Sequence, residues 1–336
     1  MTVVGPFGLS VRDKALEADV QAGLAAVEAG LLDATKSEVP FITEAAQHLV
    51  SAGGKRFRPL LVMLASQFGD PDAPGVVPSA VVVELTHLAT LYHDDVMDEA
   101  DVRRGVESAN TRWGNSVAVL TGDFLFARAS HILADLGPQA VRIQAEAFER
   151  LVTGQILETA GPRDGRDPVD HYMDVLGGKT GSLVAVSGRF GALMAGADES
   201  VVDILTQYGE RLGIAFQLAD DVLDIASDSH ESGKTPGTDL REGIPTLPVL
   251  HLRARAAAEG RPEDKELVEL LDGDLGDDAR LAEALRRLRA HPALEQARRD
   301  TVRFAQEARA TLAPLPECYA KAALEELCDA VVHRAG

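Results

Sequence analysis

The chain has 336 residues, of which 46% are hydrophobic and 26% charged, so it can build a substantial core. Its 33 basic and 53 acidic residues leave a formal charge of −20, which argues against nucleic acid as the main partner because a phosphate backbone requires a basic surface. Two cysteines, Cys318 and Cys328, are too few for a disulfide framework or a cysteine-based zinc site. Without a secretory signal or a run of about 18 apolar residues, we expect a cytoplasmic protein with no membrane span.

Helical periodicity dominates the chain, with Ala, Leu and Glu recurring at helical spacing. The segments that show it are residues 14–35, 40–51, 78–100, 140–160, 199–226 and 264–310. Sustained alternation with period two is absent, and only 4% of the residues are aromatic, which favours a helical core over a β-sandwich. The breaks between segments are too short to be domain linkers. We therefore predict one all-α domain over residues 1–336, with its motifs at about 40–250 and a more polar helical part at about 251–336.

Two segments read Asp-Asp-x-x-Asp at the end of an apolar helix, at residues 94–98 and 220–224. The first and last aspartates of each lie on one helix face, with Cβ atoms about 5–6 Å apart. Carboxylates at this spacing repel each other by about 3 kcal/mol at an effective dielectric constant near 20, so at the mouth of an apolar core they need a counter-charge. Hard oxygen ligands suit Mg²⁺, which completes its coordination with water and substrate phosphate. One such cluster could equally be a solvated helix face, but two predict several Mg²⁺ ions held between facing helices.

Basic residues concentrate at four places beside these acidic clusters. They are Gly53-Gly54-Lys55-Arg56-Phe57-Arg58-Pro59, Arg103-Arg104-Gly105, Gly178-Lys179-Thr180-Gly181-Ser182 and Gly233-Lys234. Glycine lets the backbone approach an anion closely, while Lys and Arg supply charge and forked donors. Gly-Lys-Thr is not a Walker motif here, because the first glycine and the preceding strand are missing. Each place alone is a weak signal, but together they predict a cavity that binds more than one phosphorylated ligand.

In this order, the blocks resemble those of the trans-isoprenyl diphosphate synthases (polyprenyl synthetases). The matching blocks are residues 53–59, 94–98 with 103–105, 178–180, 216–224, and 233–234 through Thr246-Leu247-Pro248. The resemblance covers about residues 40–335. It implies an all-α isoprenoid synthase-type helical bundle around a central cavity, usually as a homodimer, with the two aspartate motifs facing each other across the cavity mouth.

The resemblance also implies roles for individual residues. The expected Mg²⁺ ligands are Asp94, Asp98 and Asp220, with support from Asp95, Asp221 and Asp224. The expected contacts to isopentenyl diphosphate are Lys55, Arg58, His87 and Arg104. The expected contacts to the allylic diphosphate are Arg103, Lys179, Thr180, Gln217 and Lys234. The residues expected to take part in catalysis are Asp94, Asp95, Asp98, Arg103, Lys179, Asp220, Asp221 and Lys234.

Two of these positions need comment. A lone histidine on an apolar helix is more often a core residue, but His87 lies seven residues before Asp94, two turns back on about the same face. Members of the family often carry a lysine where Ile244 stands, so one cationic contact to the allylic diphosphate is expected to be missing.

The implied activity is a Mg²⁺-dependent head-to-tail (1'-4) condensation of isopentenyl diphosphate with an allylic prenyl diphosphate. The expected product is a lipophilic all-trans polyprenyl diphosphate of medium or long chain. Ala89 and Thr90, one turn before the first aspartate motif, are both small, whereas short-chain members tend to carry aromatic residues there. A short-chain farnesyl or geranylgeranyl diphosphate synthase is the alternative.

Other classes explain fewer of the residues. A metal phosphohydrolase of the His-Asp type would use His93-Asp94, but the other histidines lack a matching spacing and the second aspartate motif would have no role. A regulatory synthase subunit would typically lack one aspartate motif. A terpene cyclase or head-to-head condensing enzyme would not need the second diphosphate site that residues 53–59 and Arg103-Arg104 indicate. The sequence indicates no role beyond packing for residues 255–310.

Overall fold

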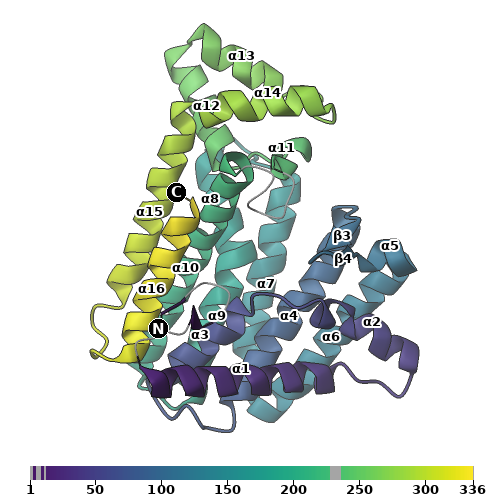
Figure 1. Ribbon diagram of the computed structural model, residues 1–336, viewed down its shortest axis with the longest axis vertical. Helices are drawn as coiled ribbons and strands as arrows, with labels where there is room; N and C mark the ends of the chain where they lie inside the picture. Colours follow the sequence, from purple (N-terminus) through teal and green to yellow (C-terminus); the bar gives the residue numbers. More distant parts are fainter. Residues whose placement is uncertain (1–2, 5–8, 11–12, 228–235, 336) are drawn as a thin grey trace. The chain divides into compact units, whose positions relative to one another are not determined.

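The computed structural model describes residues 3–4, 9–10, 13–227 and 236–335, and in this part the chain is almost entirely helical (Figure 1). Its helices are α1 (Lys14–Ala34), α2 (Pro40–Ser51), α3 (Phe57–Ser66), α4 (Val76–Met97), α5 (Ala109–Trp113), α6 (Asn115–Leu136), α7 (Pro138–Ala160), α8 (Pro168–Leu176), the π-helix η1 (Gly177–Gly181), α9 (Ser182–Met194), α10 (Glu199–Ala226), α11 (Thr238–Arg241), α12 (Leu247–Glu259), α13 (Pro262–Leu271), α14 (Asp278–Arg289), α15 (Pro292–Thr311) and α16 (Tyr319–Ala335). Within the described ranges, the only strands form two antiparallel hairpins: β1 (Val3–Val4) with β2 (Leu9–Ser10), and β3 (Val102–Arg103) with β4 (Val106–Glu107). The predicted all-α fold is confirmed.

The structure differs from the predicted elements in two places. Residues 264–310 form three helices, because Asp277 caps α14 by accepting a hydrogen bond from the Arg280 amide at 2.9 Å and Pro292 begins α15. The helix predicted over 78–100 ends at Met97 and is followed by the β3–β4 hairpin. Left-handed backbone at Arg104 (φ 55°) and Gly105 (φ 78°) makes that turn.

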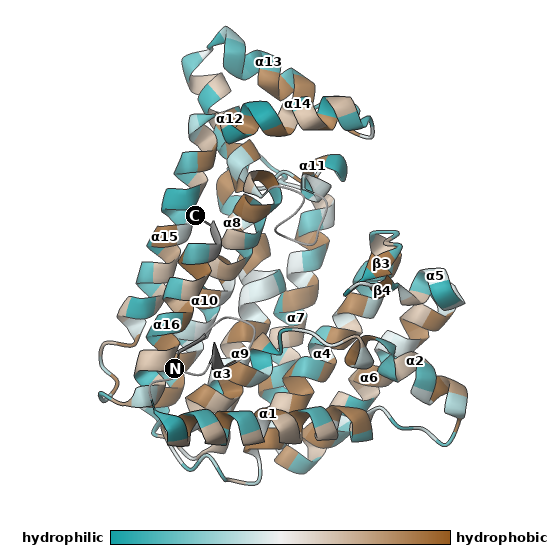
Figure 2. Ribbon diagram, in the orientation of Figure 1, coloured by the Kyte–Doolittle hydropathy of each residue, from teal (hydrophilic) through white to brown (hydrophobic). Residues whose placement is uncertain are grey.

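Helix α1 shows how a helix in this chain is encoded. Asp13 caps it, with one carboxylate oxygen accepting hydrogen bonds from the amides of Ala15 and Leu16 at 3.0 and 2.9 Å. Its buried side chains are Leu16, Val20, Val27, Leu31 and Ala34. They recur at helical spacing, so hydrophobic and hydrophilic residues alternate along α1 in Figure 2. This apolar face packs against α3 and α4.

Contacts between Cα atoms divide the chain into two compact units, each made of separate stretches. Unit 1 comprises Met1–Glu149, Leu183–Gly209 and Thr311–Leu327, and unit 2 comprises Arg150–Ser182, Glu210–Ala310 and Cys328–Gly336. Helices α7, α9, α10, α15 and α16 each contribute residues to both units. The first aspartate motif belongs to unit 1 and the second to unit 2. The single domain expected over residues 1–336 stays a prediction.

The core of unit 1 is built around α4, which packs against α1, α3 and α6. Tyr92 of α4 is fully buried, and its hydroxyl donates to the Ala45 carbonyl at 2.6 Å and accepts from the Leu49 amide at 3.2 Å. Burial raises the pKa of Tyr92 to about 12. This side chain therefore ties α4 to α2, just before the basic loop 52–56 that joins α2 to α3.

Unit 2 holds a different buried anchor in its α12–α14 region. Asp264, 2% exposed, accepts a hydrogen bond from Arg255 Nε at 3.1 Å and lies 3.0 Å from His291 Nε2. Burial alone would raise the pKa of Asp264, but the hydrogen bonds and charges of His291 and Arg255 lower it. The carboxylate thus connects α12, α13 and the start of α15.

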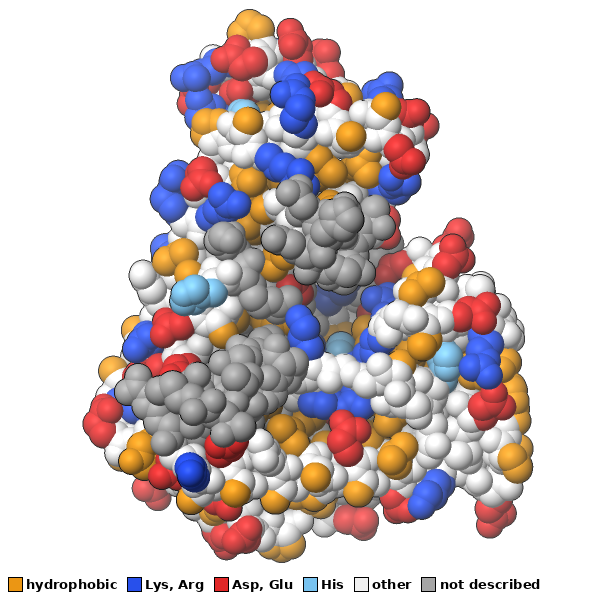
Figure 3. Space-filling model, in the orientation of Figure 1, with side chains coloured by type: hydrophobic (Ala, Val, Ile, Leu, Met, Phe, Trp, Pro, Cys, Tyr) orange, Lys and Arg blue, Asp and Glu red, His pale blue; other side chains and the backbone are white. Residues whose placement is uncertain are grey.

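The surface agrees with the acidic composition. On the face shown in Figure 3, acidic side chains are spread widely, with basic ones interspersed among them. Among the described helices, α6 meets the length and hydropathy criteria for crossing a membrane. A core helix of a soluble protein satisfies the same criteria, so the expected absence of a membrane span stays a prediction.

Candidate active site

The first aspartate motif lies at the end of α4, and its three carboxylates differ in burial. The Asp98 amide donates to the Asp94 carbonyl at 2.8 Å and closes the helix. Asp95 is fully buried, whereas Asp94 is half-buried and the Asp98 side chain is 43% exposed. The outer two aspartates can therefore reach a ligand from solvent, and the middle one faces the protein.

Arg103 holds the buried middle aspartate. Its Nε donates to Asp95 Oδ1 at 2.5 Å, and its Nη2 lies 3.9 Å from Asp98 Oδ2. The other oxygen of Asp95, Oδ2, has no hydrogen-bond partner among the described residues. Burial raises the pKa of Asp95, although the charge and hydrogen bond of Arg103 oppose that change. The β3–β4 hairpin is thus tied to the motif by an ion pair.

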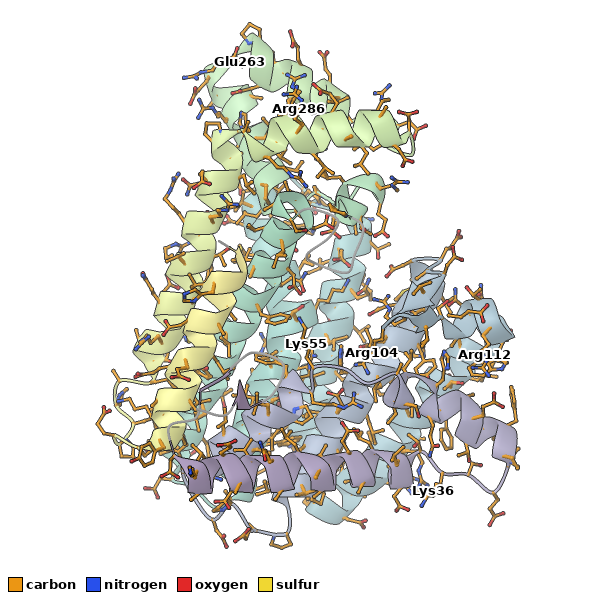
Figure 4. All side chains as sticks on the ribbon, viewed as in Figure 1. Lys36, Lys55, Arg104, Arg112, Glu263 and Arg286 are labelled. Atoms are coloured by element: carbon orange, nitrogen blue, oxygen red, sulfur yellow. The ribbon has the colours of Figure 1, made fainter. Side chains whose placement is uncertain are left out.

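Arg104, the next residue, points to the loop that joins α2 and α3. Its Nη1 donates to the carbonyl of Leu49 at 2.9 Å and to that of Gly53. A Cβ atom on Gly54 would lie 2.8 Å from Arg104 Cζ, and Gly54 has a φ of 142°. Only glycine therefore lets the loop backbone lie against this guanidinium. Figure 4 labels Arg104 and Lys55, which follows Gly54, beside each other.

Within the same loop, Arg56 is bound to acidic side chains. It adopts left-handed backbone (φ 44°) before α3, and its guanidinium pairs with Glu28 and with Glu84, the latter at 3.0 Å. It also donates to the carbonyls of Val50 and Gly53 at 3.0 and 3.1 Å. Burial opposes its charge, but the two glutamates raise the pKa of Arg56 overall. Arg56 therefore shapes the loop.

Arg58 and His87 complete the basic group of unit 1. Arg58 Nε is buried and has no hydrogen-bond partner in the described ranges. Burial lowers the pKa of Arg58 to about 10, with a smaller lowering from Arg104 and an opposing effect from Glu84, so Arg58 stays cationic at neutral pH. Burial and the surrounding arginines lower the pKa of His87 well below its usual value, so its imidazole is neutral and can donate one hydrogen bond.

The second aspartate motif, in unit 2, also has a buried middle aspartate. Asp221 is 3% exposed; Tyr172 Oη donates to its Oδ2, and Gln217 Nε2 donates to its Oδ1 at 3.1 Å. Burial raises the pKa of Asp221 well above its usual value, and the charges of nearby acidic residues add to that rise; these are Asp239, Asp224 and Glu158. Asp220 is half-buried, as Asp94 is in the first motif.

The third aspartate of this motif is bound to backbone amides. Asp224 accepts from the amides of Thr238 and Asp239, both at 3.2 Å, and its carbonyl accepts from the Gly237 amide at 2.8 Å. It therefore supports the turn into α11, while its predicted support of a metal site stays a prediction. Lys234 lies outside the described residues.

The Gly-Lys-Thr block forms the π-helix η1. Lys179 Nζ lies 2.5 Å from Glu158 Oε2 of α7, and Thr180 Oγ1 donates to Gln217 Oε1 at 3.4 Å. A Cβ atom on Gly154 would lie 2.5 Å from the Lys179 amide nitrogen, so this glycine allows α7 to approach η1. Since Gln217 also donates to Asp221, its side-chain amide connects η1 to the second aspartate motif.

Each unit thus brings together one part of the predicted site. In unit 1 these are Lys55, Arg58, His87, Asp94, Asp95, Asp98, Arg103 and Arg104. In unit 2 they are Lys179, Thr180, Gln217, Asp220 and Asp221. In the described ranges, no three His, Cys, Asp or Glu side chains converge closely enough to hold a metal ion by themselves. The predicted facing of the two motifs, and their metal-binding roles, stay predictions.

Three residues without a predicted role hold the predicted ones in place: Glu84, Glu158 and Tyr172. Glu84 carried a usable signal, because a charge within the apolar run of α4 needs a partner, whereas Glu158 lies in the more polar α7 and carried no such signal. Tyr172 carried none, since its partner Asp221 is 49 positions away. His93, the residue on which the phosphohydrolase alternative depends, has its Nε2 3.1 Å from the Val119 carbonyl.

The polyprenyl synthetase family model matches residues 39–288. The nonaprenyl diphosphate synthase of Mycobacterium tuberculosis is 47% identical over 330 residues, covering 98% of this chain and 97% of that protein. The chain therefore belongs to the polyprenyl synthetase family, and it is a prenyltransferase. Enzymes of this family are generally metal-dependent.

Solved structures agree with this assignment. A geranylgeranyl pyrophosphate synthase from Corynebacterium glutamicum, complexed with calcium and isoprenyl diphosphate, matches with a TM-score of 0.86 and 44% identity over 97% of this chain and 99% of that one. A decaprenyl diphosphate synthase from Rhodobacter capsulatus matches with a TM-score of 0.85 and 37% identity over 96% of this chain and 99% of that one. The all-helical fold is therefore shared over nearly the whole chain.

Proposed function

We propose that the protein condenses isopentenyl diphosphate with an allylic prenyl diphosphate, with Mg²⁺, to give an all-trans polyprenyl diphosphate of medium or long chain. The observation that carries this proposal is the basic group beside the first aspartate motif in unit 1. Arg58 and Arg104 are cations in a mostly buried setting, with neutral His87 among them. Glu84 supplies one negative charge to this group, and a diphosphate would supply several more oxygen acceptors for forked donors.

The donor set also fits Mg²⁺. The metal would be held by Asp94, Asp98 and Asp220. Each of them offers a hard carboxylate oxygen and is either half-buried or exposed, so the oxygen can reach a metal ion. Bound there, Mg²⁺ would stabilise the negative charge that develops on the departing diphosphate. The middle aspartates, Asp95 and Asp221, would keep the motifs in place from within the protein.

The reaction requires positioning and charge stabilisation from the chain. Lys55, Arg58, His87 and Arg104 would bind the diphosphate of isopentenyl diphosphate, while Arg103, Lys179, Thr180, Gln217 and Lys234 would serve the allylic diphosphate. The allylic C–O bond breaks, diphosphate leaves with the electron pair, and a new C–C bond forms as the isopentenyl carbon chain loses a proton. Holding both substrates together removes much of the entropic barrier. Diphosphate itself can accept the proton.

The proposed chain length rests on the small residues one turn before the first motif. Ala89 is fully buried, so an aromatic side chain at this position would project into the protein interior. Two of the relatives described above are named for long products, nonaprenyl and decaprenyl diphosphate. The Corynebacterium enzyme, named for geranylgeranyl pyrophosphate, represents the shorter-chain alternative.

An elongation assay tests the proposal. Purified protein is incubated with Mg²⁺, labelled isopentenyl diphosphate and a set of allylic primers, and the extracted products are sized by chromatography. We expect all-trans products longer than geranylgeranyl diphosphate, and shorter products from Ala89→Phe. Hydrolysis without elongation would contradict the proposal, and an unchanged product distribution in Ala89→Phe would contradict the account of chain length.

The expected assembly is a cytoplasmic homodimer. Helix α6 supports it, because this apolar helix leaves Val119 and Leu120 39% and 65% exposed. Covering these side chains with a second copy would remove apolar surface from water. Light scattering should give twice the mass of one chain for the native protein and a smaller mass for Leu120→Glu.

A further inference from the structure

Glu84 occupies the centre of the basic group of unit 1. It belongs to α4, one turn before His87, and is 2% exposed. Its Oε1 accepts a hydrogen bond from Arg56 Nη1 at 3.0 Å and lies 3.6 Å from Arg104 Nη2. A buried carboxylate is tolerated only with partners of this kind. One oxygen atom is therefore shared by two guanidinium groups from different parts of the chain.

The two arginines also share a second acceptor. Both donate to the Gly53 carbonyl, Arg56 at 3.1 Å, while Arg56 also binds the Val50 carbonyl and Arg104 the Leu49 carbonyl. Arg56 directly precedes α3, and Arg104 belongs to the turn of the β3–β4 hairpin. Glu84 thus joins α4 to the basic loop and to the hairpin.

Two physical effects of Glu84 on an incoming diphosphate have opposite signs. Its negative charge lies among cations and by Coulomb's law should weaken the binding of an anion. Its ion pair holds Arg104, and its hydrogen bond to Arg56 holds the loop that carries Lys55 and leads into α3, where Arg58 lies. A misplaced guanidinium loses most of the binding energy of its forked, directional contacts. We therefore expect the positioning effect of Glu84 on diphosphate binding to be larger than the repulsion from its charge.

We propose that Glu84 is a positioning residue for isopentenyl diphosphate. By holding Arg56 and Arg104, it aligns Lys55, Arg58 and Arg104 on a single diphosphate. This inference rests on the proposed function, because the ligand of the basic group is taken from it. It adds to that function a residue that touches no substrate.

Three variants separate position from charge. Glu84→Gln removes the charge and keeps the length of the side chain, while Glu84→Asp keeps the charge and shortens the reach. The matched control is Glu28→Gln, because Glu28 binds Arg56 but is 43% exposed and, in the described part of the chain, forms no ion pair with Arg104. Initial rates are measured against isopentenyl diphosphate and against the allylic primer separately, and thermal unfolding is followed for each variant.

The expected result is a split between the two substrates. For Glu84→Asp, whose carboxylate no longer reaches both guanidinium groups, the KM for isopentenyl diphosphate should rise about tenfold, the loss expected for a charged hydrogen bond, while the KM for the primer stays within about twofold. Glu84→Gln keeps an acceptor oxygen at the same reach, so its KM for isopentenyl diphosphate should rise less than that of Glu84→Asp. Glu28→Gln should change neither by more than about twofold. Since Glu84→Asp retains the buried charge, it should fold even if Glu84→Gln does not.

Other outcomes would overturn the inference. A lower KM for isopentenyl diphosphate in Glu84→Gln, with native behaviour of Glu84→Asp, would show that the carboxylate acts through charge alone. Equal rises in both KM values, in step with a lower melting temperature, would show a purely structural role. If the native protein elongates primers and neither variant changes the KM for isopentenyl diphosphate, the inference fails and the proposed function stands. If the native protein consumes no isopentenyl diphosphate, the proposed function itself fails.

Discussion

The two aspartate motifs share one sequence pattern but stabilise their middle carboxylates in different ways. In unit 1, Asp95 is held by a cation, the Arg103 guanidinium. In unit 2, Asp221 is held by the neutral donors of Tyr172 and Gln217, and its charged neighbours are acidic. The same Asp-Asp-x-x-Asp pattern therefore contains an ion pair in the first motif and a network of neutral hydrogen bonds in the second.

This difference has a consequence for the roles of the surrounding residues. Arg103 is tied to Asp95 in the structure, so its predicted contact with the allylic diphosphate requires it to serve two anions. In unit 2, Asp221 has no cationic partner among the described residues. The charge of the second motif is therefore balanced less by the protein itself, and we expect a bound cation to stabilise this motif more than the first. The sequence pattern thus specifies where the carboxylates lie, whereas neighbouring residues determine the charge around each middle carboxylate.

The largest effect is expected from breaking the ion pair. Arg103→Met would leave the Asp95 carboxylate, which is fully buried, without its cation, and losing one partner of a buried pair costs about 3 kcal/mol of unfolding free energy. Urea unfolding followed by circular dichroism measures this loss. The double variant Arg103→Met with Asp95→Asn should recover part of it, because the unpaired charge is gone. A double variant as unstable as the single one would contradict the ion-pair interpretation.

A smaller effect is expected from the neutral network. Tyr172→Phe removes a hydrogen bond to the Asp221 carboxylate and should cost about 2 kcal/mol, less than the loss of the ion pair. Tyr208→Phe is the matched control, because its hydroxyl donates at 2.6 Å to a neutral carbonyl, that of Leu324. Both should be destabilised, but only Tyr172→Phe should raise the KM for the allylic primer. Equal primer KM values in the two variants would separate Tyr172 from the site.

The buried carboxylate of Asp264 should make the stability of the protein depend on pH. The pKa of Asp264 is lowered in the folded protein, so its contribution to stability is present above its unfolded value of about 3.9 and is lost as the pH falls through the lower folded value. Asp264→Asn should therefore cost about 1.5 kcal/mol at pH 7 and almost nothing near pH 2. Urea unfolding across this range measures both values. A difference that stays constant with pH would show that His291 and Arg255 do not hold the charged form.

The smallest effect is expected at the half-exposed ion pair of η1. Glu158→Gln removes the partner of Lys179, whose side chain is 32% exposed, so the stability change should stay below about 1 kcal/mol. The KM for the allylic primer should change more than the stability, because Lys179 would keep its charge but would no longer be held in one position. A primer KM raised about threefold, with an unchanged melting temperature, is the expected result. A lower primer KM would show that Glu158 merely competes for the lysine.

The sequence predicted the positions of the site residues better than their orientation. Helical spacing placed Asp94 and Asp98 on one face, and this spacing is local, so it survives folding. Which carboxylate turns inward depends on Arg103 and Tyr172, which come from a hairpin and another helix. The β3–β4 hairpin was not predicted, because strands of two residues are too short to show an alternating sequence pattern.

The π-helix η1 makes the second site sensitive to chain length in a way that point substitutions do not test. Tyr172 precedes this widened turn and Lys179 lies within it. Deleting one residue between them would tighten the turn and rotate the preceding helix by about 100°. Tyr172 would then turn away from Asp221 while Lys179 still reached Glu158. A deletion of one residue between Tyr172 and Lys179 would therefore break the Tyr172–Asp221 contact and keep the Lys179–Glu158 contact, although all four residues remained in the sequence.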